Sequence, residues 1–167
     1  MNHLTLNLKD ISAEDFAPFG DLIDQRPDCA VKMNEARFDR FVDLATVDVD
    51  GGCAAVNVSL MQCVIVSGLP YEITLLERHP HGSQAFMPVT GDPYVVVVAP
   101  PGDRPDTSAL KAFRVGGHQG INLRRGVWHL PMLGFTRHQS FFVVDKKGNG
   151  NCDEYSLEET ITLIGSV

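Results

Sequence analysis

The sequence predicts an all-β fold with only short helices, built as a closed β-barrel or a double-stranded jelly roll. Eight to ten short stretches either alternate apolar with polar residues or run continuously apolar, as strands do. Glycine and proline clusters separate these stretches. Because helical patterns extend no further than a turn or two, repeating helix and strand units are disfavoured. A barrel of this kind can hold one small ligand.

The first elements follow from alternation and helix capping. Residues 4–8 alternate leucine with polar side chains, which predicts a half-buried strand. Ser12 and Asp15 resemble a capping box that opens a very short helix. Residues 24–28 are expected to form a loop and residues 40–49 a strand.

The middle of the chain is expected to supply the longest strands. Residues 53–66 are rich in valine and isoleucine, and residues 71–78 alternate between two faces, so both predict strands. Residues 85–89 predict a short strand. Residues 94–99 are continuously apolar, as expected for a strand covered on both sides.

The last third predicts loops and two further strands. Residues 100–105 read as a loop, and Asp106 or Thr107 can cap a short turn. The remaining elements are strands at 121–129 and 139–144 and a loop at 146–151.

Length and charge narrow the class of protein. The chain of 167 residues suits a single domain spanning 1–167, and 44% hydrophobic with 21% charged residues is typical of a globular protein. A net charge of -7 argues against binding to nucleic acid. No apolar run is long enough for a membrane span and no signal peptide is visible, so we expect a cytoplasmic protein without a membrane partner. Four reduced cysteines are expected: Cys29, Cys53, Cys63 and Cys152.

The stretch from 77 to 86 concentrates the chemistry of the chain. Glu77, His79 and His81 are each two residues apart, so on an extended strand their side chains share one face. Gly82 permits a sharp turn that brings Gln84 toward the same space. This pattern predicts a polar site at the end of a strand.

Two motifs in this region resemble those of the cupin superfamily. They are the His79-x-His81 pair with Gln84, and the later Gly126-Val-Trp-His129 segment. In cupins the equivalent residues ligate a metal inside a jelly roll, which implies His79, His81, Gln84 and His129 as ligands here. Such a set suits zinc, nickel, manganese or iron. In the alternative, metal-free interpretation, the histidines only form hydrogen bonds with the substrate.

Longer segments resemble one family much more specifically. The chain reads E-R-H-P-H-G-S-Q-A-F-M-P at 77–88, Y-V-V-V-V-A at 94–99, Q-G-I-N-L-R-R-G-V-W-H-L-P at 119–131, N-C-D at 151–153 and R-F-V-D-L-A at 40–45. Together these resemble the ureidoglycolate lyase family. The resemblance implies a homodimeric cupin-like barrel that cleaves ureidoglycolate to glyoxylate and urea in allantoin degradation. It also associates nickel with activity, and it favours His79, Gln84 and His129 over His81.

The implied substrate explains why these side chains are needed. Ureidoglycolate is a carbinolamine with a carboxylate, so its cleavage requires a base, an acid and a group that holds the carboxylate. His79 and His129 suit the two proton transfers, and Glu77 is an alternative base. A divalent ion that polarises the substrate oxygens is the competing scheme.

Substrate binding calls for a cation and an amide. An arginine fork suits the carboxylate, and Gln84 suits the ureido group or the carboxylate. Trp128 is expected to form a wall of the site. The arginine candidates are Arg78, Arg125, Arg40 and Arg124.

Two functions of other classes compete with the lyase. One is a non-catalytic cupin-like sensor of small carboxylic acids. The other is a different metal-dependent cupin enzyme, such as an isomerase or a dioxygenase.

Overall fold

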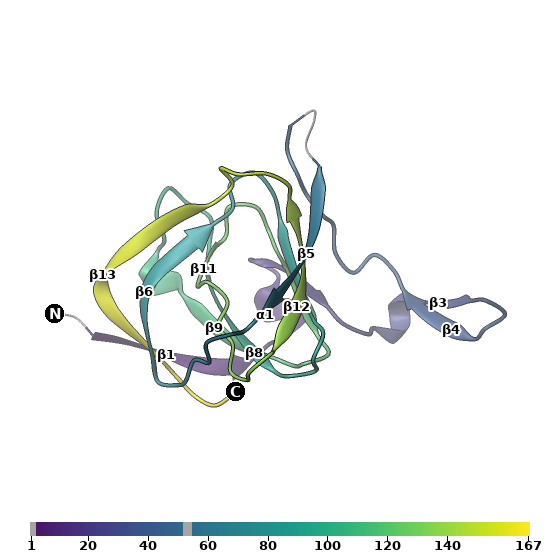
Figure 1. Cartoon of the computed structure of the whole chain (residues 1–167), viewed down its shortest axis with the longest axis horizontal. Coiled ribbons are helices and arrows are strands. Elements are labelled where there is room, and N and C mark those ends of the chain that lie inside the picture. The colour runs from purple at the N-terminus through teal and green to yellow at the C-terminus, as the bar shows by residue number, and fades with distance from the viewer. Residues whose placement is uncertain (1–2, 52–54) are drawn as a thin grey trace.

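The computed structural model describes residues 3–51 and 55–167, and this part of the chain is almost entirely β-structure (Figure 1). Six strands close into a barrel, five more form an antiparallel sheet, and two form a separate hairpin. The barrel strands in spatial order are β1 (His3–Asp10), β13 (Asp153–Ile164), β6 (Tyr71–Arg78), β11 (Trp128–His129), β8 (Tyr94–Ala99) and β9 (Lys111–Val115). The all-β prediction is therefore confirmed.

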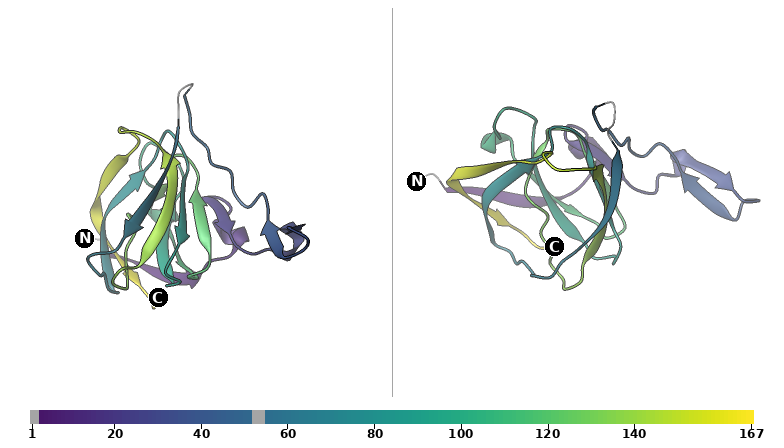
Figure 2. Two further views of the ribbon diagram at one scale, coloured as in Figure 1. Left: turned by 45° about the vertical axis from the view of Figure 1, so that its right-hand side comes forward. Right: turned by 45° about the horizontal axis from the view of Figure 1, so that its top comes forward.

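The five-stranded sheet lies beside the barrel, and the hairpin projects from it (Figures 1 and 2). The sheet strands in spatial order are β2 (Gly20–Ile23), β10 (Gly120–Leu123), β7 (Gln84–Pro88), β12 (Ser140–Lys146) and β5 (Val56–Gln62). The hairpin consists of β3 (Ala30–Met33) and β4 (Phe38–Phe41). β1 closes the barrel by pairing in parallel with both β13 and β9.

The predicted caps are present. The helix α1 (Ala13–Phe16) begins after Ser12, whose Oγ accepts a hydrogen bond from the backbone N–H of Asp15. The 3-10 turn η2 (Thr107–Ala109) is capped by Asp106 in the same way, through the N–H of Ser108. A second 3-10 turn, η1 (Pro27–Cys29), precedes the hairpin. None of the described helices has the length and apolar character that crossing a membrane would require.

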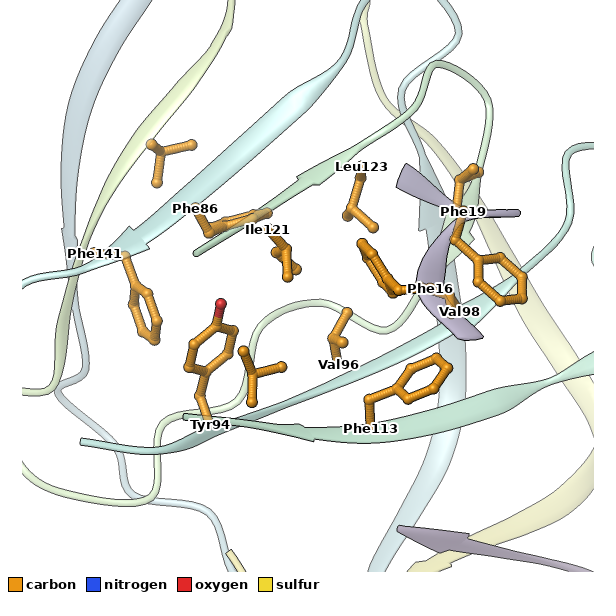
Figure 3. Packing of buried hydrophobic residues seen from close by; sticks show 13 residues of the cluster. Phe16, Phe19, Phe86, Tyr94, Val96, Val98, Phe113, Ile121, Leu123 and Phe141 are labelled. Carbon is orange, nitrogen blue, oxygen red and sulfur yellow. The ribbon is translucent and has the colours of Figure 1, made fainter. Parts of the chain in front are cut away.

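Strand β8 separates two apolar clusters, because all six of its residues are buried. Val96 and Val98 face the cluster between the barrel and the five-stranded sheet, where Figure 3 shows them among aromatic rings such as Phe113. Val95 and Val97 face the cluster that lies among the barrel strands. The continuous apolar run at 94–99 thus forms the predicted strand covered on both sides.

Several predicted boundaries were wrong. The strand expected at 40–49 ends at Phe41, and Asp43 has a φ of +56°, which breaks an extended chain. The strand expected at 121–129 is divided by a turn at Gly126, whose φ is +76°. The strand expected at 53–66 spans Val56–Gln62, and its predicted start at residues 53 and 54 lies outside the described residues.

Four strands have no counterpart in the sequence prediction. β2, β3 and β9 are only four or five residues long, and β13 carries charged residues on its exposed face. Their positions depend on pairing with distant strands, which local alternation does not reveal. Among the described residues, Cys29, Cys63 and Cys152 are free thiols, as expected, whereas Cys53 lies outside the described residues.

Candidate active site

The strand register brings Glu77 and His129 together. His129 on β11 pairs directly with Glu77 on β6 and with Val98 on β8. Directly paired residues point to the same face of a sheet, and Val98 belongs to the cluster between the barrel and the five-stranded sheet. Glu77 and His129 therefore point inward, toward that second sheet.

The buried ring of His129 has a defined orientation. Its Nδ1 lies 3.0 Å from the carbonyl oxygen of Val127, which can only accept, so Nδ1 carries a hydrogen. Its Nε2 lies 3.3 Å from Oε1 of Glu77 but has no hydrogen-bond partner of good geometry. The carboxylate and this nitrogen therefore form a close contact without a well-aligned hydrogen bond.

His79 approaches the same point just after the end of β6. Its ring centroid is 5.2 Å from that of His129, and its Nδ1 makes a short contact with the carbonyl oxygen of Asn151. As in His129, this leaves Nε2 buried without a partner. Two buried imidazole nitrogens without hydrogen-bond partners thus converge on one carboxylate.

This arrangement fits a divalent metal ion. Potential ligand atoms of Glu77, His79 and His129 all lie within 4.8 Å of one another. Two imidazoles and one carboxylate are a common catalytic donor set, and three protein ligands leave coordination positions for a substrate. The two unpartnered Nε2 atoms are the observation that supports this fit.

Electrostatics keep Glu77 ionised. Burial alone raises the pKa of its carboxyl group, but the close contact with His129 and the charges of both histidine rings outweigh burial, so the pKa lies below its ordinary value. The thiol of Cys152 lies 3.7 Å from Oε2 of Glu77. Burial and the adjacent carboxylate raise the pKa of Cys152 to about 11, so this thiol is a neutral donor toward Glu77.

Gln84 faces the same interior from the opposite sheet. It pairs with Leu123, which belongs to the cluster between the sheets, and is two residues from Phe86, which does too. Its Nε2 donates to Oδ2 of Asp145 at 3.4 Å, while its Oε1 is buried without a partner. An amide oxygen is therefore available to a ligand.

His81 does not join this group. β6 ends at Arg78, so the strand alternation that would place His81 beside His79 stops before it. The exposed ring of His81 instead has its Nδ1 3.1 Å from Oδ2 of Asp50. The Glu77, His79 and His129 group therefore assembles without the second histidine of the H-x-H motif.

The arginines next to the motifs are occupied by other partners. Arg78 donates to Asp153 at 2.9 Å and to the carbonyl of Gly102, and its guanidinium stacks over Trp128. Trp128 is buried in the cluster among the barrel strands and donates to the same carbonyl, so its ring lies on the face of β11 opposite to His129.

The described contacts of Arg125, Arg124 and Arg40 likewise do not involve Glu77, His79 or His129. Arg125 donates two hydrogen bonds to Asp48, of 2.7 and 2.9 Å, and a third to Asp50 at 3.0 Å. Arg124 has a long contact of 3.8 Å with Asp21. Arg40 lies on the projecting hairpin.

Sequence reasoning missed the residues that support the site. Asn151 and Cys152 contact His79 and Glu77, and their only signal was the N-C-D segment at 151–153, to which no role was assigned. Asp145, which orients Gln84, and Asn57, which donates to Asp145 at 3.4 Å, gave no local signal.

Comparison with known proteins gives a consistent result. A family model described as ureidoglycolate lyase matches residues 3–164. Ureidoglycolate lyase from Burkholderia mallei is 44% identical over 162 residues, which are 95% of this chain and 93% of the relative. The corresponding proteins of Stutzerimonas stutzeri and Pseudomonas syringae pv. tomato are 42% and 40% identical, each over 96% of this chain and 94% of the relative. The chain belongs to the ureidoglycolate lyase family.

Proposed function

We propose that this protein is a carbon-nitrogen lyase that cleaves ureidoglycolate into glyoxylate and urea. The observation that carries the proposal is the convergence of two buried imidazole nitrogens on the Glu77 carboxylate, in a chain that belongs to this family. The relatives are named ureidoglycolate lyase and are matched over nearly their whole length. The small-molecule substrate follows from this assignment, and we also infer that the protein works as a homodimer.

The reaction needs two proton transfers around one bond cleavage. A base removes the hydroxyl proton, the carbon-oxygen bond becomes the glyoxylate carbonyl, and the carbon-nitrogen bond breaks with its electron pair on the ureido nitrogen. An acid then protonates that nitrogen to release urea. Glu77 suits the base because its lowered pKa keeps it ionised at neutral pH, and the unpartnered Nε2 of either histidine is an alternative.

A divalent metal ion is compatible with the same residues. Glu77, His79 and His129 would hold it, and it would polarise the hydroxyl and carboxylate oxygens of the substrate. In either case the Val127 carbonyl fixes His129 so that Nε2 points to the reaction centre. The Asn151 carbonyl does the same for His79.

Gln84 supplies recognition of the ureido group. Its donation to Asp145 leaves Oε1 as the part of the amide that accepts a hydrogen bond, and the ureido N–H groups are donors. An unpartnered buried oxygen also penalises ligands that lack a donor, so it favours substrates with an N–H.

The direct test is turnover of racemic ureidoglycolate by the purified protein, with glyoxylate and urea measured separately. Equal amounts of both products are expected. Ammonia in place of urea would identify an amidohydrolase, and thermal stabilisation by glyoxylate without any turnover would identify a sensor. Either result would refute the lyase assignment.

A further inference from the structure

The β3–β4 hairpin is an arm that projects away from the barrel and the five-stranded sheet (Figures 1 and 2). Val31 pairs with Arg40, and Met33 pairs with Phe38, so these four side chains lie on one face of the arm. The other face carries an ion pair of 2.6 Å between Lys32 and Asp39. The arm therefore has one apolar face, with Arg40 at one end of it.

That apolar face is exposed to an unusual degree. The exposed fraction of Phe38 is 62%, and Val31 and Met33 are also exposed. A two-stranded hairpin is only marginally stable on its own in water, so an extended arm with apolar side chains is expected to pack against something.

A second exposed apolar surface lies on the outer face of the five-stranded sheet. Phe142 on β12 pairs with Leu60 on β5 and with Met87 on β7, and Val58 lies beside them on β5. The exposed fractions of Val58 and Leu60 are 66% and 61%, and Phe142 is half exposed. β5 is also the edge strand of its sheet, and among the described strands only β12 pairs with it, so its other edge can accept another segment.

A second copy of the chain is the occupant that matches both surfaces. Each copy carries one arm and one sheet face, so a two-fold axis allows both arms to be exchanged at once. The exposed apolar side chains of the arm and the sheet offer on the order of 600 Å² per copy, close to the ~800 Å² per partner of a stable interface. The arm of each copy would then cover the exposed sheet face of the other copy.

Among the described residues, no arginine contacts Glu77, His79 or His129 of the proposed site. Its substrate is an anion, yet Arg78 and Arg125 are held by Asp153 and by Asp48 and Asp50. Arg40 is exposed, and within residues 3–51 and 55–167 its side chain has no hydrogen-bond or ion-pair partner. The edge strand β5 is linked to the site through Asn57, Asp145 and Gln84.

We propose that the arm of one copy docks along β5 of a second copy, and that Arg40 then binds the substrate carboxylate in the partner's site. The proposal rests on the proposed lyase function. Arginine is suited to this role because its planar fork makes two charge-assisted hydrogen bonds with a carboxylate. Each active site is thus completed in trans.

Subunit complementation tests this directly. Arg40→Gln and Glu77→Gln are each expected to lower kcat/KM by about 100-fold, for Arg40 through two lost charge-assisted hydrogen bonds. When equal amounts of the two variants exchange subunits, half of the dimers are mixed, and each mixed dimer holds one intact site. Activity should therefore recover to about a quarter of that of the wild type. No recovery would overturn the proposal, because it would place Arg40 and Glu77 in the same copy's site.

A matched control separates Arg40 from the arm as a whole. Arg37 lies on the same arm and is paired with Glu35 at 3.0 Å, so Arg37→Gln should retain wild-type activity. Arg40→Lys should recover part of the lost activity by restoring the charge without the fork. A loss in Arg37→Gln equal to that in Arg40→Gln would overturn the role of Arg40.

Sedimentation tests the docking without reference to catalysis. The wild type should sediment as a dimer, and both Phe38→Ser and Leu60→Ser should shift it toward monomer. A monomeric wild type, or dimers that persist in both variants, would overturn the docking. If the wild type fails to cleave ureidoglycolate but dimerises through these residues, the lyase assignment fails and the interface stands.

Discussion

Replacing Glu77 by Gln tests the centre of the proposed site. The substitution keeps the size of the side chain but removes the charge that lies 3.3 Å from Nε2 of His129. At an effective dielectric constant of 20, opposite charges at this distance attract by about 5 kcal/mol, and desolvation offsets much of that. We therefore expect a loss of about 1–3 kcal/mol in the free energy of unfolding when His129 is protonated.

The effect of Glu77→Gln on catalysis should be larger than its effect on folding. Losing a positioned base or a metal-ligating carboxylate lowers kcat by about 10²–10⁴-fold. Steady-state kinetics on ureidoglycolate and chemical denaturation measure the two effects separately. Glu72→Gln is the matched control because Glu72 is exposed on the same strand. Activity of Glu77→Gln within about threefold of the wild type would refute the assigned role.

Three further predictions concern the same residues. In a chelating buffer, the contribution of Glu77 to the free energy of unfolding should be complete above its unfolded pKa of 4.5. It should be lost as the pH falls through the lower pKa of the folded protein. Chemical denaturation at several pH values should show this dependence in the wild type but not in Glu77→Gln. In calorimetric titrations with Ni²⁺ or Zn²⁺, His79→Ala should weaken metal binding about tenfold or more, whereas His81→Ala should change it little. Equal effects of the two substitutions would contradict a metal site formed by Glu77, His79 and His129. Cys152, with a pKa of about 11, should react with iodoacetamide at pH 8 about 100-fold more slowly than a thiol of pKa 9.0. Glu77→Gln should accelerate this reaction because it removes the adjacent carboxylate. Rapid labelling of Cys152 in the wild type would contradict a neutral thiol.

The fold class was predictable because it depends on local patterns. Alternation of apolar and polar residues marks β1 and β6, and the continuous run at 94–99 marks β8 as buried on both faces. The boundaries were less predictable where the backbone takes a positive φ without a glycine, as at Asp43. β13 was missed because its bulged register with β6 is set by distant pairing rather than by its own sequence pattern.

The candidate site was only partly predictable for a related reason. Glu77 and His129 were expected from motifs, and register explains why they meet. The arginines could not be sorted, because whether a guanidinium is available depends on carboxylates far away in the sequence. Asp153 lies 75 residues from Arg78, and Asp48 lies 77 residues from Arg125. Strand alternation also could not show that the chain turns before His81.

Charge balance connects the proposed metal site with the proposed role of Arg40. The substrate carboxylate would approach a site that already contains the Glu77 carboxylate, in a protein with a net charge of -7. A positive group is required to offset that repulsion, and a divalent ion or the partner's arm would each supply one. Substitutions at the two sources of positive charge should affect different measured quantities. Arg40→Gln should raise KM and leave metal affinity intact, whereas His79→Ala should lower metal affinity without affecting dimerisation.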